Sequence, residues 1–96
     1  MIPEKIQAYF DGDKLRIFPR KWRMKLEVLN YLMTFFPQDK KATFTEKEVN
    51  AILFQHCQDY VTIRRALIDF QYLQRQDDGG LYWVKHYERS LSDINQ

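Results

Sequence analysis

The feature that most constrains the fold is an apolar stripe between Pro19 and Pro37. Apolar side chains recur there every three or four residues, which is the spacing of one face of an α-helix. The stripe consists of Trp22, Leu26, Leu29, Met33 and Phe36, and it is widened by Val28, Leu32 and Phe35. Because proline is tolerated at a helix start and cannot continue a helix, this pattern predicts a core helix over residues 22–36, closed by Pro37.

Length and composition limit what can surround this helix. The chain has 96 residues, of which 45% are hydrophobic and 16% aromatic. This is enough apolar material for one packed core and too little chain for a large enzyme. We therefore expect a single domain over residues 1–96, with a short N-terminal helix at 3–10, a core at 15–84 and a tail at 85–96. The apolar residues with helical spacing in the tail are Tyr87, Leu91 and Ile94.

Two shorter helices are predicted after the core helix. Thr45 and Glu48 have the spacing of a capping box, in which each side chain accepts a hydrogen bond from the backbone of the other residue. A second helix should therefore begin at Thr45 and run to about His56. Apolar residues have helical spacing again over 61–70, which predicts a third helix there.

A β-hairpin is predicted after the third helix. The Asp-Gly and Gly-Gly pairs at 78–80 permit the positive φ angles of a hairpin turn, so residues 72–75 and 81–84 should pair as strands. Residues 15–18 read as a short extended segment before the core helix. This order of elements predicts an α+β fold: a mainly helical winged helix-turn-helix with a C-terminal two-stranded β-hairpin wing.

Short motifs are spread over residues 11–83. They are Asp11-Gly12 with Leu15, Phe18-Pro19 with Lys21, Phe44-Thr45-Glu46, Glu48-Val49-Asn50 with Leu53, His56 with Asp59, Arg64-Arg65, Leu67-Ile68-Asp69, Leu73, Arg75, Gly80 and Tyr82. In them the sequence resembles a bacterial family, the domain of unknown function numbered 2087. The resemblance implies a winged-helix-like module, found alone or attached to helix-turn-helix transcriptional regulators, with no established activity or catalytic residues. Relatives usually carry glycine where this chain has Gln71, which leaves the end of the third helix open.

Candidate catalytic and metal-binding residues are few. His56, Cys57 and Asp59 are the only local cluster with such chemistry, and the Cys-x-x-Cys spacing of zinc sites is missing. No phosphate-binding loop, dinucleotide motif or nucleophile elbow occurs. We expect no enzyme, no metal and no cofactor, with His56 and Asp59 serving as helix ends. The alternative is a Cys57-dependent enzyme or redox sensor. A single cysteine and no long apolar run suggest a cytoplasmic protein without a membrane partner.

The net charge of +2 does not name a partner, but the cations cluster. Residues 14–25 contain six cations and no acid, next to the predicted start of the core helix. Free N–H groups and the positive helix end could hold a phosphate there. The predicted nucleic-acid-binding residues are Arg20, Lys21, Arg23 and Lys25 for backbone phosphates, and Arg64 and Arg65 from the third helix. The alternative is a solvated basic face whose long side chains cover apolar neighbours.

The predicted third helix and wing are a poor match for DNA by charge. Residues 59–84 contain three basic and four acidic side chains, a net charge of −1. The outer side of the third helix holds Val61, Arg65, Ile68 and Tyr72, a mixture more typical of a protein contact. Our hypothesis is a module of transcriptional regulation that contacts duplex DNA or acts as a regulatory domain. The alternative is a protein-interaction or homodimer module using Val61, Ile68 and Tyr72, and a further possibility is that Ile68 and Tyr72 belong to the core.

Overall fold

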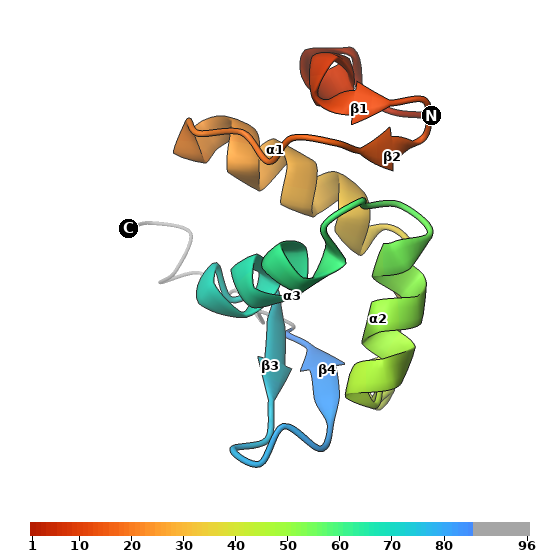
Figure 1. The fold of residues 1–96 in the computed structure, drawn as a ribbon. Coiled ribbons are helices and arrows are strands. Elements are labelled where there is room, and N and C mark those ends of the chain that lie inside the picture. The colour runs from red at the N-terminus through yellow and green to blue at the C-terminus, as the bar shows by residue number, and fades with distance from the viewer. Residues whose placement is uncertain (86–96) are drawn as a thin grey trace.

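Helices and two small β-hairpins make up residues 1–85, the part of the chain that the computed structural model describes (Figure 1). The elements in chain order are the 3₁₀-helix η1 (Glu4–Tyr9), β1 (Phe10–Asp11), β2 (Lys14–Leu15), α1 (Trp22–Met33), α2 (Glu46–Phe54), α3 (Tyr60–Asp69), β3 (Leu73–Arg75) and β4 (Tyr82–Val84). The fold class is α+β with a C-terminal hairpin, as predicted. The predicted tail residues Tyr87, Leu91 and Ile94 lie outside the described residues.

Helix α1 supplies the centre of the core. Val28, Leu29 and Leu32 have no exposed surface, so the apolar stripe is confirmed as a core helix. The predicted start at Trp22 is confirmed, but the predicted end at residue 36 was wrong. The helix ends at Met33, and the backbone continues to Phe36 with hydrogen bonds between residues three apart, which is a tighter turn. Trp22, a predicted member of the stripe, is 62% exposed. Helical spacing predicts the direction of a side chain, but it does not predict how far neighbouring elements extend along the helix to cover it.

The starts of α2 and α3 are capped by side chains. Thr45 Oγ1 accepts from the Glu48 N–H at 3.1 Å, and Glu48 Oε1 accepts from the Thr45 N–H at 2.9 Å, so the predicted capping box is confirmed. Helix α2 ends at Phe54, two residues earlier than expected. Asp59 Oδ1 accepts from the Thr62 N–H at 3.2 Å. Hydrogen bonds from the side chain and the backbone of Thr62 lower the pKa of Asp59.

Helix α3 ends in a left-handed turn at Gln71. The Tyr72 N–H donates to the carbonyl of Leu67 at 2.8 Å, and the Gln71 N–H donates to Ile68 at 3.0 Å, the pattern of a Schellman motif. Gln71 has a φ of 66°, the only positive φ at a non-glycine residue in the described chain. Gln71 therefore leaves the helix exit in place but puts a side chain in a conformation that glycine adopts more easily.

Backbone hydrogen bonds tie both hairpins to the helices. In the C-terminal hairpin Leu73 pairs with Val84 and Arg75 with Tyr82. Phe44, which precedes α2, adds a bridge to Tyr82 through two hydrogen bonds of 2.8 and 2.7 Å. Leu15 of β2 forms a parallel bridge with Cys57: its N–H donates to the carbonyl of His56 at 2.7 Å, and its carbonyl accepts from the Gln58 N–H at 2.9 Å. The Phe44 bridge holds the C-terminal hairpin against the start of α2 (Figure 1), and the Leu15 bridge holds the N-terminal hairpin to the turn between α2 and α3.

Candidate functional site

The basic segment, residues 14–25, contains six cations and no acid. Arg16, Arg20, Lys21 and Arg23 are exposed, whereas Lys14 and Lys25 are half-buried. The two half-buried lysines lie over aromatic rings, Lys14 Nζ at 4.5 Å from the centroid of Phe54 and Lys25 Nζ at 5.5 Å from that of Phe18. No ion pair with another residue of 1–85 neutralises any of the six cations.

The second half of the basic segment forms the start of α1, where Arg20, Lys21, Arg23 and Lys25 lie close together along the chain. Lys21 occupies the N-cap position, its side chain makes no capping hydrogen bond, and the first turn carries no acidic residue. The first-turn N–H groups are therefore open to water or to an anion. Beside this helix start lies a groove of about 560 Å³ lined by Tyr9, Ile17, Phe18, Pro19, Arg20, Lys21 and Met24.

A second hollow, the α3–hairpin groove, lies between α3 and the C-terminal hairpin. Its volume is about 340 Å³. It brings Glu46 of α2 together with residues of α3 and of the hairpin, among them three arginines. The groove is lined by Glu46, Arg64, Arg65, Ile68, Asp69, Arg75 and Tyr82.

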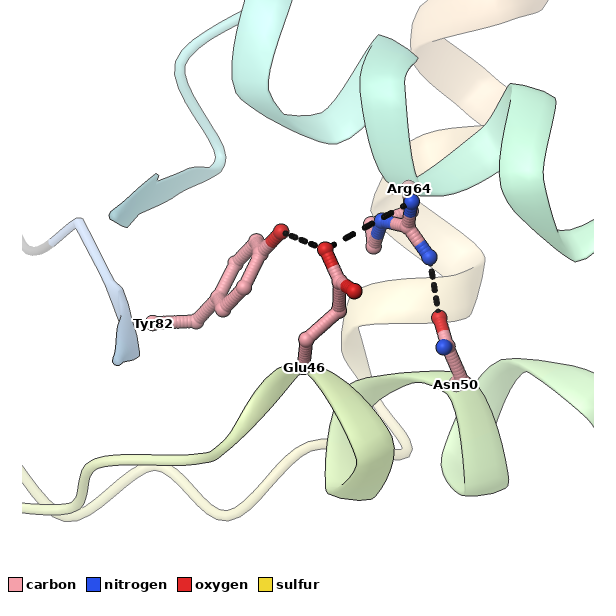
Figure 2. A network of polar contacts seen from close by, with 4 residues as sticks. All are labelled: Glu46, Asn50, Arg64 and Tyr82. Carbon is pink, nitrogen blue, oxygen red and sulfur yellow. Dashed lines mark hydrogen bonds and ion pairs between the residues drawn. The ribbon is translucent and has the colours of Figure 1, made fainter. Parts of the chain in front are cut away.

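One wall of the groove is a polar network of side chains from three elements (Figure 2). The Tyr82 hydroxyl donates to Glu46 Oε1 at 3.0 Å, and Arg64 Nη2 lies 3.6 Å from the same oxygen. Arg64 Nη1 also donates to Asn50 Oδ1. Burial and the hydrogen bond to Glu46 raise the pKa of Tyr82. The network joins α2, α3 and β4.

The two adjacent arginines that the sequence assigns to nucleic acid have different surroundings. The Arg64 side chain is 15% exposed and contacts Asn50 and Glu46 within the domain. Arg65 is exposed and has no side-chain hydrogen bond or ion pair with another residue of 1–85. Helical spacing could have suggested this difference, because Arg64 lies one residue after Ile63 of the buried face. The contacts with Asn50 and Glu46 had no sequence signal.

The predicted protein-contact residues do not form one exposed apolar patch. Val61 is 37% exposed, but Ile68 and Tyr72 are half-buried and pack against the core. Burial, with a contribution from the charge of Glu27, raises the pKa of Tyr72. Phe54, which the sequence reasoning missed, is 59% exposed at the end of α2. Its position off the Val49–Leu53 stripe was the available signal.

The His56–Cys57 pair lies between α2 and α3. Cys57 is buried, and burial raises the pKa of its thiol to about 12, so the sulfur is protonated and a poor nucleophile at neutral pH. The His56 ring stacks on Phe35 with 3.6 Å between ring centroids, and burial lowers the pKa of His56. Residues 1–85 contain no group of three or more His, Cys, Asp or Glu side chains placed to hold a metal ion. No described helix is long and apolar enough to cross a membrane.

Comparison with known proteins yields one match. No curated protein and no solved structure matches the chain. Residues 14–84, from the start of β2 to the end of β4, match the model of a family described as an uncharacterized protein conserved in bacteria (DUF2087). This range includes the basic segment and every residue of the α3–hairpin groove. The chain therefore belongs to this DUF2087 family.

Proposed function

We propose that the domain is a winged-helix module of transcriptional regulation that holds duplex DNA by its backbone phosphates, at the basic segment. The observation that carries this proposal is a run of six cations without an acid, four of which (Arg20, Lys21, Arg23 and Lys25) lie at the uncapped start of α1. Phosphate groups are bound by Lys and Arg side chains and by helix N-terminal N–H groups, and both are present together here.

The arrangement of the elements supports the winged-helix part of the proposal. Helices α1, α2 and α3 are followed by a hairpin, and Phe44 between α1 and α2 pairs with β4 of that hairpin. A winged helix uses the same order of helices followed by a hairpin wing. The helix-turn-helix pair corresponds to α2 and α3.

The charges favour binding to phosphates over reading of base edges. Arg64 contacts Asn50 and Glu46 within the domain, so Arg65 is the one arginine of α3 that projects freely. The hairpin turn carries Asp77 and Asp78, which repel a phosphate backbone. We therefore expect binding that depends strongly on salt and weakly on sequence.

The test is a titration of duplex DNA at several salt concentrations. Arg20→Ala combined with Lys21→Ala should weaken binding and flatten the slope of log K against log salt by up to about two, because two phosphate contacts are lost. The matched control is Lys41→Ala with Lys47→Ala, which removes the same charge from exposed positions outside the basic segment. An equal effect of both double variants, or no duplex affinity of the unmodified chain at low salt, would contradict the proposal.

The second candidate function is protein interaction or self-association. The observation that favours it is the exposure of Phe54 and Val61 on either side of the turn between α2 and α3. An apolar contact changes little with salt, whereas phosphate binding weakens steeply. Molar mass by size-exclusion chromatography at two salt concentrations separates the two: a salt-independent dimer that Val61→Asp abolishes supports this candidate.

A further inference from the structure

The α3–hairpin groove contains two arginines whose charge is not used within the described chain. Arg65 comes from α3 and Arg75 from the end of β3, and neither has a side-chain hydrogen bond or ion pair with another residue of 1–85. The Arg75 guanidinium lies against the hairpin turn, since a Cβ added at Gly79 would stand 3.0 Å from Arg75 Nη1. Two guanidinium groups from different elements thus line one hollow.

The other charged residues that line the groove are Glu46, Arg64 and Asp69. The charge of Glu46 is balanced by Arg64 at 3.6 Å, and the same carboxylate oxygen also accepts from the Tyr82 hydroxyl. Asp69 is the remaining acid that lines the groove, and it is exposed. The groove therefore presents two free cations and one free anion to an occupant.

The size and charges of the groove indicate the class of ligand. A volume of about 340 Å³ suits a small molecule. One arginine fork can satisfy the two oxygens of a carboxylate, whereas a phosphate monoester offers three oxygens and nearly two charges to two forks. The carboxylate of Asp69 can accept a hydrogen bond from a hydroxyl group.

We propose that the α3–hairpin groove binds a small phosphate monoester with a hydroxyl-bearing organic part, with Arg65 and Arg75 on the phosphate and Asp69 on a hydroxyl. This site uses none of the cations of the basic segment, so the proposal does not rest on the binding of DNA there.

The experiment is a calorimetric titration of the chain with ribose 5-phosphate, repeated with inorganic phosphate and with ribose. We expect saturable one-to-one binding of ribose 5-phosphate, weaker binding of inorganic phosphate and none of ribose. Arg65→Gln and Arg75→Gln should each weaken the binding of ribose 5-phosphate at least tenfold. Lys41→Gln, which removes one positive charge from an exposed position outside both the groove and the basic segment, should leave it unchanged. Circular dichroism of each variant checks that it is folded.

The outcomes distinguish the groove from a general attraction of anions and from DNA binding. An equal loss in Lys41→Gln, or equal affinities for inorganic phosphate and ribose 5-phosphate, would overturn the proposal. So would a loss of duplex binding in Arg75→Gln without any binding of ribose 5-phosphate, because the groove would then hold nucleic-acid phosphates. Failure of the unmodified chain to bind duplex DNA affects the proposed function alone, since ribose 5-phosphate is titrated without DNA.

Discussion

The basic segment and the α3–hairpin groove both concentrate cations, but they collect them in different ways. The six cations of the basic segment are neighbours in the sequence, and none has an ion pair in the described chain. The three arginines of the groove lie among acids from α2 and α3, and one of the three is part of a network within the domain. A run of like charges along the chain contains no oppositely charged neighbour, whereas cations that are brought together by folding can form ion pairs with acids of other elements.

The largest expected effect separates the two neighbouring arginines of the groove. Arg64→Ala should lower the free energy of unfolding by about 2 kcal/mol, because Asn50 and Glu46 lose a charged hydrogen-bonding partner. Arg65→Ala should change it by less than about 0.5 kcal/mol, since that side chain is exposed and unpaired. Urea denaturation of both variants measures the difference. Equal stabilities would mean that the network does not hold α2 to α3.

The next effect contrasts the capped start of α2 with the uncapped start of α1. Lys21→Ser places a good N-cap on α1, where the backbone already has the extended angles of a cap, and should stabilise the domain by about 1 kcal/mol. The same change should weaken duplex binding, because a phosphate-contacting cation is lost.

The opposite change is Thr45→Ala, which removes the cap of α2 and should destabilise the domain by about 1 kcal/mol. Chemical denaturation and duplex titration of the same samples provide both readings. If Lys21→Ser changes neither stability nor DNA affinity, the start of α1 has no role in either.

The smallest expected effect lies at the edge of the groove, where α3 ends. Gln71→Gly should stabilise the domain by about 0.5 kcal/mol, since glycine adopts a φ of 66° without strain but loses more backbone entropy on folding. The change also removes the hydrogen bond from Lys85 to Gln71, which is exposed and contributes little. Gln74→Gly is the control, because Gln74 lies in extended β3 and accepts from Trp83 Nε1 at 3.0 Å. The Gln74→Gly variant should be less stable than the unmodified chain in the same denaturation assay. A loss of stability in both variants would exclude strain at Gln71.

Much of the fold could be predicted because its signals are local. The capping box of Thr45 and Glu48 depends on four consecutive residues, and the cap of Asp59 on the next helix depends on as few. The hairpin turn could be located because glycine permits the positive φ angles that such a turn needs, and Gly79 does have a φ of 73°. Such features form wherever the chain carries the pattern, so they need no knowledge of distant residues.

The candidate site could be predicted only in part. The basic segment can be found by counting charges along the chain, and four of its six cations are exposed in the structure. The groove could not be found in this way, because Glu46 and Tyr82 are 36 residues apart and meet only when β4 pairs with Phe44. The exposed side chain of Trp22 and the half-buried ones of Ile68 and Tyr72 likewise depend on which elements cover them.

The sequence by itself determined the helices, their caps, the C-terminal hairpin and the dense run of cations, since each follows from periodicity, side-chain capping, turn chemistry or charge within about fifteen residues. Only the tertiary structure decided which cations remain free. Arg64 and Arg65 are adjacent residues of the same type, but one step of about 100° around α3 turns the first toward Asn50 and Glu46 and leaves the second beside an open groove. The physical reason is that a charge is neutralised by contacts across space, and those contacts exist only once the helices and the hairpin have packed.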